Sequence, residues 1–294
     1  MQNVTIVGAG KVGGALAIAL SRIGYRIDEL IVRRSQTATA LKKKYLADTK
    51  ISVWPNVEQI PSKIILITTG DPEIEAVANY LRPLAQKGQV VFHTSGSLSS
   101  SALLILKSAG CDTGSLHPLV SVSDAVRGAK LFKDSYFCIE GTPSAVRTGK
   151  QIVRFLGGKS FTIDADKKSL YHAAAVMSAG HVTSLFDVAV EALEKCGISQ
   201  PEARKILFPL LASTAENLRH QTPEKALTGS FARLDQAAFE SHISALQKIG
   251  NKEILGLYIA LGERSLDIVQ RRSGKSPQLT RFRKSISMAK RKTK

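Results

Sequence analysis

The sequence has few of the residues from which disulfide frameworks and metal sites are built. Its 294 residues include only three cysteines, Cys111, Cys138 and Cys196, and their spacing fits neither a zinc site nor a disulfide framework. We therefore predict three free thiols in a cytoplasmic protein, and no metal site. Aromatic residues are only 6% of the chain, and no zinc finger, RNP-like aromatic pattern or helix-turn-helix spacing is present.

Long uninterrupted apolar runs are also missing. Gly, Ser or charged residues interrupt each run short of the roughly 18–20 residues that cross a bilayer, which predicts no membrane span. A strand-like run begins at once at residues 4–7, where a signal peptide would have a basic segment followed by a longer apolar one. The prediction is a cytoplasmic protein without a secretory signal.

Acidic residues are missing from the C-terminal end of the chain. Residues 281–294 contain seven lysines and arginines and no Asp or Glu, so they supply seven of the net +17 charges. Such a block is typical of a solvated end, and we predict a basic disordered tail over residues 281–294. Nucleic acid is expected as a partner only through this tail, by salt-sensitive contacts.

The start of the chain has a glycine-rich turn between a strand pattern and a helix pattern. Gly8 permits a tight turn, Gly10 lets a pyrophosphate approach the backbone, and Gly13 lets the helix pack against the strand. The first turn of that helix then offers free N–H groups to phosphate. The predicted pyrophosphate loop comprises Gly8, Ala9, Gly10, Lys11, Val12 and Gly13.

The second strand pattern ends without the acidic residue that would accept hydrogen bonds from the ribose of NAD. Its end reads Arg33-Arg34-Ser35. Because a guanidinium can hold a 2′-phosphate through paired hydrogen bonds, these residues favour NADP over NAD. The alternative is a surface arginine pair at a strand end.

Two later strand patterns, at residues 64–67 and 89–92, end in small polar residues. The carboxyl ends of parallel strands border the ligand crevice of an open α/β sheet. The cofactor-binding residues predicted there are Thr68, Thr69, Asp71, Ser95 and Gly96. A third segment ends in His117-Pro118, which would place His117 near the nicotinamide, unless it is a hydrogen-bonded structural histidine. Strand patterns at 136–139 and 160–163 close the sheet, so residues 1–164 are predicted to form a Rossmann-like, doubly wound α/β domain.

After Asp166 the strand patterns stop, and helices are predicted at about 166–196, 200–219, 235–248 and 251–273. Residues 165–280 are thus an all-α domain. The long apolar pattern of its first helix, with scattered Ala and Gly, suits packing against another helix or a second subunit, so we expect a homodimer through this domain.

The first of these helices begins with two groups that can do chemistry. Lys168 and His172 are one i,i+4 step apart and share a helix face with small residues such as Ala175, as a ligand-facing groove would require. Reduction of a carbonyl or imine needs a proton donor beside the nicotinamide. We interpret Lys168 as polariser and proton donor, His172 as the residue that orients it or the substrate, and His117 as a third catalytic candidate.

Several motifs occur in an order that resembles a known protein group. They are Gly8-x-Gly10-x-x-Gly13, His93-x-Ser95-Gly96, Ser115-Leu116-His117-Pro118-Leu119, Lys168-x-x-Tyr171-His172-Ala173-Ala174-Ala175 and residues 228–235, T-G-S-F-A-R-L-D. The chain resembles the oxidoreductases that join a Rossmann-like domain to the helical DUF2520 domain, similar in plan to pyrroline-5-carboxylate reductases, β-hydroxyacid dehydrogenases and ketopantoate reductases. The resemblance implies the fold and the cofactor class, and says little about the substrate. Our leading hypothesis is an NADP-dependent reductase of a small oxo acid or imine, and a ketopantoate-type reduction is its most specific version.

The match to the group is not complete. Relatives often have Ser-Asn where this chain has Ala179-Gly180 and Arg-Gly-Asp where it has Arg233-Leu234-Asp235, which leaves the substrate contacts open. The substrate candidates are Thr228, Arg233, Asp235 and His242; the alternative for the last three is a helix-start ion pair and a surface histidine. The competing interpretation of the whole chain is a catalytically silent NADP-binding regulatory or scaffold protein.

Overall fold

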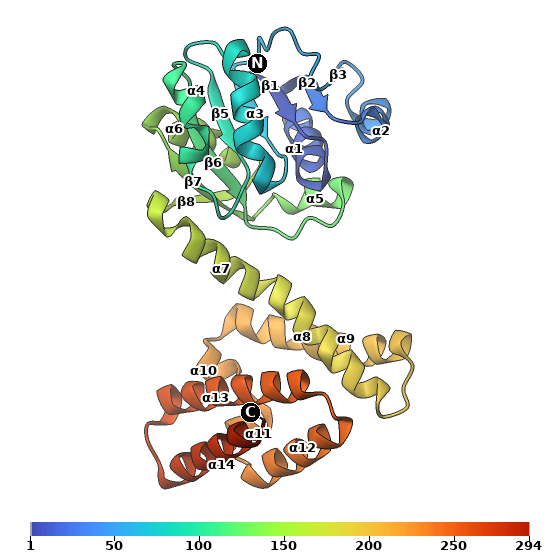
Figure 1. Cartoon of the computed structure of the whole chain (residues 1–294), viewed down its shortest axis with the longest axis vertical. Coiled ribbons are helices and arrows are strands. Elements are labelled where there is room, and N and C mark those ends of the chain that lie inside the picture. Colours follow the sequence, from blue (N-terminus) through green and yellow to red (C-terminus); the bar gives the residue numbers. More distant parts are fainter. Residues whose placement is uncertain (1, 294) are drawn as a thin grey trace. The chain divides into compact units, whose positions relative to one another are not determined.

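The computed structural model describes residues 2–293 and has an α/β half followed by a helical half (Figure 1). The chain divides into two compact units between Ala179 and Gly180. The boundary that we expected after residue 164 lies earlier, at the end of the last strand. The difference is helix α7 (Lys168–Ser178), which stays with the first unit because its side chains contact the loops of the sheet.

An eight-stranded sheet forms the first unit, in the order β3-β2-β1-β4-β5-β6-β7-β8. The strands are β1 Asn3–Val7, β2 Arg26–Val32, β3 Lys50–Val53, β4 Ile64–Ile67, β5 Val90–His93, β6 Asp112–Pro118, β7 Tyr136–Gly141 and β8 Lys159–Thr162. Neighbouring strands are parallel except for β6 and β7. This confirms the Rossmann-like, doubly wound fold, and adds the short strand β3, which we had not predicted.

Helices cover both faces of this sheet (Figure 1). They are α1 Lys11–Arg22, α2 Ser35–Tyr45, α3 Ile74–Leu81, α4 Leu104–Ser108, α5 Ala125–Leu131 and α6 Pro143–Phe155, with single 3-10 turns at 71–73, 82–84, 100–103 and 165–167. Because successive strand residues point to opposite faces, Ile64 and Leu66 pack with α1, α5 and α6, whereas Ile65 and Ile67 pack with α3 and α4. The two cores fix the strand ends at which the candidate site lies.

The second unit is entirely helical among the residues described. Its helices are α8 Gly180–Glu194, α9 Gln200–His220, α10 Pro223–Ala226, α11 Gly229–Ala232, α12 Gln236–Ile249, α13 Lys252–Ser273 and α14 Pro277–Thr293. The predicted helix at 166–196 is in fact two helices, α7 and α8, because Ala179 leaves the helical conformation (φ −128°, ψ −69°). The other three predicted helices are present with nearly the expected bounds.

The predicted disordered tail is wrong for the residues described. Residues 281–293 belong to α14, whose Phe282, Ile286 and Ala289 are buried together with Leu255 and Phe239 in the core of the helical unit. The physical reason is the spacing of these apolar residues, which recur every three or four positions between the charges and so form one continuous helix face. Lys294 lies outside the described residues.

The stretch Ala165–Glu194 is long and apolar enough to cross a membrane by composition and length alone, with a mean hydropathy of 1.4 in its most apolar window. We had expected no such segment. Near its beginning, Lys168 and Tyr171 form hydrogen bonds with Ser115 and His117 of β6. The three cysteines are unpaired, as predicted.

Candidate active site

The glycine-rich loop joins β1 to α1 in the geometry that the sequence predicts. Gly8 has a positive φ of 98°, and any side chain on Gly13 would collide with the Gly8 carbonyl and with Thr68. The Thr68 hydroxyl donates a hydrogen bond to the Gly8 carbonyl at 2.6 Å and so ties the loop to the end of β4. Nothing lies within 4 Å of the position that a Gly10 side chain would take, which leaves the backbone there open to a ligand.

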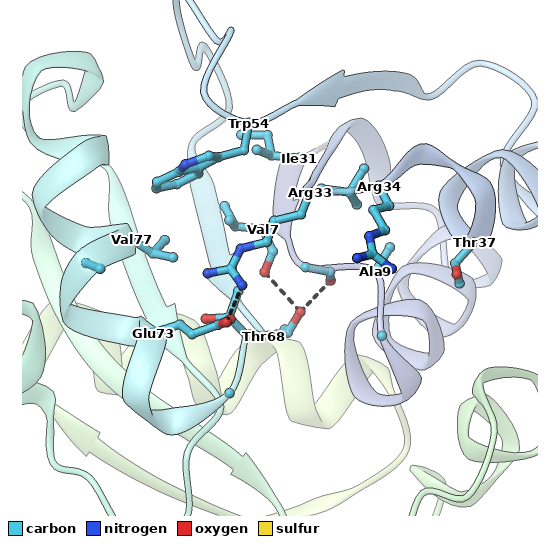
Figure 2. Close-up of a pocket in the computed structure, with 16 residues that line it drawn as sticks. Val7, Ala9, Ile31, Arg33, Arg34, Thr37, Trp54, Thr68, Glu73 and Val77 are labelled. Atoms are coloured by element: carbon cyan, nitrogen blue, oxygen red, sulfur yellow. Dashed lines mark hydrogen bonds and ion pairs between the residues drawn. The ribbon is translucent and has the colours of Figure 1, made fainter.

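A cavity of about 350 Å³ opens beside this loop (Figure 2). It is lined by Gly8, Ala9, Gly10, Arg33, Arg34, Thr68 and Thr69 among the predicted cofactor residues, and also by Thr37, Trp54, Glu73 and Val77. Sequence reasoning missed this second set, because only the fold brings β3 and the first turn after β4 beside the loop. The predicted residues Lys11, Val12 and Ser35 are not part of the lining; Lys11 and Ser35 are the first residues of α1 and α2.

The two arginines at the end of β2 have different surroundings. Arg33 reaches across the cavity to Glu73 and forms an ion pair at 2.6 Å (Figure 2). Arg34 lies on the other side of the cavity, near Thr37 in this view, and takes part in none of the ion pairs found in residues 2–293. Arg34 is therefore the guanidinium that remains available to a phosphate.

One polar atom in the cavity lining lacks a partner inside the protein. The Oγ1 atom of Thr69 is buried and makes no hydrogen bond within the described residues. Leaving a buried hydroxyl unpaired costs about 1–3 kcal/mol unless a ligand or water satisfies it. Together with the open backbone at Gly10, this orphan hydroxyl fits a dinucleotide that passes between the glycine loop and the end of β4.

A network of polar side chains continues from β4 to the neighbouring strand ends. Asp71 accepts hydrogen bonds from the hydroxyls of Ser95 (2.8 Å) and Ser97 (2.7 Å), which follow β5. His93 is fully buried; it bonds the Ser99 carbonyl, and burial lowers its pKa to about 4, so its imidazole is neutral. Asp71 and Ser95 thus brace the strand ends rather than line the cavity.

Lys168 occupies a different place from the one that we expected. Its side chain is 1% exposed, and its ammonium donates to the Ser95 carbonyl (3.1 Å) and the Ser115 hydroxyl (2.8 Å). Burial lowers the pKa of this ammonium. Lys168 therefore holds the ends of β5 and β6 to the start of α7 through these two hydrogen bonds.

The residues beside Lys168 form a second, partly buried group. The Tyr171 hydroxyl lies 2.6 Å from Nδ1 of His117, and the rings of His117 and His172 meet edge to face with centroids 5.6 Å apart. Burial raises the pKa of the Tyr171 phenol and lowers that of His117 to about 4. Tyr171 was present in the quoted motif, but we had given it no role.

Gly96 explains how the two histidines come together. A side chain at this position would collide with Nδ1 of His172 and with Nε2 of His117. Both nitrogens therefore lie close against the Gly96 backbone, just beyond the carboxyl end of β5. Nδ1 of His172 is buried and makes no hydrogen bond within residues 2–293, so it is the second orphan polar atom of this unit.

The four substrate candidates all lie in the helical unit. Asp235 caps α12 by accepting a hydrogen bond from the Ala238 amide at 3.0 Å, and His242 pairs with the Tyr258 hydroxyl at 2.7 Å. Arg233 is exposed at the rim of an open hollow, and Thr228 precedes the short helix α11. These contacts correct the expected helix-start ion pair, because Asp235 bonds the α12 backbone. A role in substrate binding stays a prediction. None of the described residues forms a group of three or more metal-ligating side chains.

Comparison with known families agrees with this organisation. Residues 1–118 match the Rossmann-like domain family, and residues 135–265 match the family described as domain of unknown function DUF2520. A glycerol-3-phosphate dehydrogenase [NAD(P)+] from Moorella thermoacetica is 28% identical over 109 residues. That alignment covers 33% of this chain and 32% of the enzyme, so the chain matches about a third of the relative's length.

Solved structures share the fold over almost the whole chain. A protein from Thermotoga maritima is 26% identical with a TM-score of 0.70, and the match covers 91% of this chain and 98% of that one. A candidate NADP oxidoreductase from Bacteroides fragilis has 21% identity, a TM-score of 0.74, and coverage of 92% and 98%. A reductive aminase from Aspergillus terreus, solved in complex with NADPH4, cyclohexanone and allyl amine, has 18% identity, a TM-score of 0.64, and coverage of 96% and 99%.

Proposed function

We propose that this chain, a member of the proteins that join a Rossmann-like domain to a DUF2520 domain, is an NADP(H)-dependent reductase of a small oxo acid or imine. One observation carries the proposal. The Tyr171–His117 hydrogen bond and the unpartnered nitrogen of His172 lie near the carboxyl ends of β5 and β6. The glycine loop follows the carboxyl end of β1 in the same sheet. The glycine-loop cavity and a set of protonatable side chains therefore lie at the same carboxyl end of the sheet, where open α/β sheets bind their ligands.

The cofactor residues follow from the cavity. The backbone at Gly8 and Gly10 would hold the pyrophosphate, and Thr69 would donate its unpaired hydroxyl to it. Arg34, which has no carboxylate partner in the described chain, would hold the 2′-phosphate, and Trp54 would cover the adenine. When bound, NADPH supplies the hydride. In support, the relatives solved with bound cofactor are NADP(H) enzymes.

Addition of a hydride to C=O or C=N must be completed by a proton. The raised pKa of Tyr171 keeps its phenol protonated, so the phenol donates to Nδ1 of His117 and leaves the remaining imidazole proton on Nε2. That Nε2 and the unpartnered Nδ1 of His172 lie side by side against Gly96. We assign His172 the delivery of the proton, which solvent then replaces. His117, held in one tautomer by the Tyr171 phenol, donates a hydrogen bond to the reacting group, and Tyr171 keeps its proton.

Lys168 then has a positioning role in place of the donor role that its sequence position suggested. With its ammonium held by the Ser95 carbonyl and the Ser115 hydroxyl, it fixes the loop that carries Gly96 and the strand that carries His117. Its removal should disturb both histidines at once.

The proposal is tested by NADPH oxidation, followed by absorbance, with a panel of 2-oxo acids and cyclic imines that includes ketopantoate. We expect turnover of at least one of them, and His172→Asn should lower kcat by about 100-fold while the Kd of NADPH stays the same. His181→Asn is the matched control, since His181 is an exposed residue of α8. Tight NADPH binding without turnover of any substrate would favour the silent regulatory or scaffold protein instead.

We also propose that the chain forms a homodimer through its helical unit, in the cytoplasm. Its apolar side chains are unusually exposed on α9, where Phe208 is 61% and Leu210 is 65% exposed. A further apolar hollow of about 290 Å³ lies between α8 and α13, lined by Leu185, Val188 and Leu257 among others. Exposed apolar area of this kind marks an interface. A second copy would also cover the apolar stretch that could otherwise be taken for a membrane helix.

Light scattering after size-exclusion chromatography measures the assembly directly. The protein should elute at twice its chain mass of 31.7 kDa. Phe208→Asp should convert it to a monomer, whereas Leu104→Asp, at a residue that is 60% exposed on the first unit, should not. A monomeric native protein, or a dimer that survives Phe208→Asp, would contradict the proposed interface.

A further inference from the structure

Helix α14 carries a row of cations on the side opposite its buried face. Leu279, Phe282 and Ile286 point into the core of the helical unit, while Arg281, Lys284 and Arg291 are exposed. At three- and seven-residue steps these three residues lie on one side of the helix and extend over about 15 Å along its axis. We call Arg281, Lys284 and Arg291 the basic row.

The basic row is not neutralised by the protein. Two other cations of α14 do have carboxylate partners: Arg283 pairs with Asp267 at 2.7 Å and Lys290 pairs with Glu263 at 2.6 Å. No ion pair found in residues 2–293 includes a member of the basic row. From Arg271 to the C-terminus the sequence has ten lysines and arginines and no acidic residue, so no nearby carboxylate in that segment can screen the row.

A hollow adjoins the first member of the row. It has a volume of about 610 Å³ and is lined by Arg233, Gln278 and Arg281, together with residues 234–237. Asp235, the one acidic residue in the lining, is already engaged as the cap of α12. The hollow therefore extends the positive surface from α14 onto the start of α12, and it is wide enough to admit a phosphate group.

From this surface we propose that the basic row binds the phosphate backbone of double-stranded nucleic acid, with Arg233 at the hollow as a fourth contact. The row is a fixed, nearly straight line of charge, which suits the regular phosphates of a duplex. An anionic membrane is the poorer match, because a helix that binds a bilayer needs an exposed apolar face, and the apolar face of α14 is buried.

The contacts available are to the backbone and not to the bases. The single aromatic residue of α14, Phe282, is buried, so the row offers no ring on which a base could stack. Arginine and lysine side chains aligned along a helix can contact successive phosphates, which are the same in every sequence. Binding should therefore be independent of nucleotide sequence and governed by salt.

The test is fluorescence anisotropy of a labelled 24-base-pair DNA duplex with the full chain. With three to four phosphate contacts, the logarithm of the association constant should fall with a slope of about −3 against the logarithm of salt concentration. Affinity should thus drop by roughly 40–150-fold between 50 and 200 mM salt. A second duplex of unrelated sequence should bind equally well.

The decisive comparison uses two variants that lose the same charge. Arg281→Gln/Lys284→Gln/Arg291→Gln should lower affinity at 50 mM salt by more than about tenfold and flatten the slope. Lys42→Gln/Lys43→Gln/Lys44→Gln, on helix α2, removes three positive charges elsewhere and should change affinity less than about twofold. Circular dichroism and NADPH binding establish that both variants are folded.

Three results would overturn the proposal. They are a native chain that does not bind duplex at 50 mM salt, two triple variants that weaken binding equally, and an α14 variant that binds as tightly as the native chain. A fourth contrary result is binding to vesicles of 30% phosphatidylserine that duplex DNA does not displace, which would assign the row to a lipid surface. None of these results bears on the proposed reductase activity, which is measured separately.

Discussion

The two compact units differ in what they bury. The first encloses many polar side chains, among them Lys168, His93, Glu29 and Glu140, each with hydrogen-bond partners. In the described part of the second unit only Ser285 is a buried polar residue, whereas large apolar side chains such as Phe208 are exposed. Burying a polar side chain costs desolvation free energy that burying an apolar one does not. The first unit thus has the buried polar groups of a prepared site, whereas the second has the exposed apolar side chains on which the proposed dimer depends.

The largest expected effect concerns the core of the second unit. Phe282→Ala should destabilise this unit by about 4 kcal/mol, because Phe282 is buried against Phe231 and Phe239 and its loss leaves a cavity. Urea unfolding followed by circular dichroism measures the change. The neighbouring exposed Met288→Ala should cost less than about 0.5 kcal/mol. If Phe282→Ala lowers the free energy of unfolding no more than Met288→Ala does, α14 is not part of the core, and residues 281–294 form the disordered tail that the charges suggested.

The tail also shows where sequence reasoning stops. The seven positive charges led us to predict disorder, although Leu279, Phe282 and Ile286 have the spacing of an amphipathic helix. Strand β3 was missed for the related reason that four residues containing a lysine give too short a pattern. The glycine loop, by contrast, was predictable because its glycines stand at a characteristic spacing within six consecutive residues. Gly8 needs a positive φ, Gly13 has no room for a side chain, and Gly10 leaves the backbone open to a ligand.

The sequence indicated which residues could belong to the site, but not which residues they contact. The spacing of Lys168 and His172 correctly indicates one helix face, but it cannot tell what that face meets. The groups that bond Lys168, on Ser95 and Ser115, are more than fifty residues away in the chain. Trp54 and Glu73 join the cofactor cavity for the same tertiary reason, and no local pattern marks either of them.

The second expected effect tests the buried polar groups of the first unit by acid. Because the pKa of His93 is about 4 in the folded chain and near its ordinary value of 6.5 when unfolded, the unfolded state binds more protons between these values. The stability from the neutral imidazole is complete above pH 6.5 and is lost as pH falls toward 4. The loss is about 3 kcal/mol. His117, with its pKa also at about 4, adds to it.

Urea unfolding at pH 7.5 and pH 4.5 measures this loss. His93→Gln should lower stability at pH 7.5, since the Ser99 carbonyl and the Ser95 amide both bond the imidazole. The same variant should show a smaller difference between the two pH values than the native chain. An unchanged difference would mean that His93 is not held neutral, and the contrast between the units would then rest on Lys168, Glu29 and Glu140.

The smallest expected effect separates a ligand-binding polar group from a structural one. Thr69 and Thr68 are neighbours at the end of β4, but only Thr68 has a protein partner, the Gly8 carbonyl. Thr69→Val should weaken NADPH about fivefold, or about 1 kcal/mol, while the stability of the free protein is unchanged or slightly raised, because an unsatisfied hydroxyl is removed. Thr68→Val should lower the stability of the free protein, because it releases the loop. Titration calorimetry and thermal unfolding of both variants measure the two quantities. If Thr69→Val destabilises the free protein and leaves the Kd of NADPH unchanged, its hydroxyl is bonded within the protein, and the first unit loses one of its two orphan atoms as evidence for a prepared cofactor site.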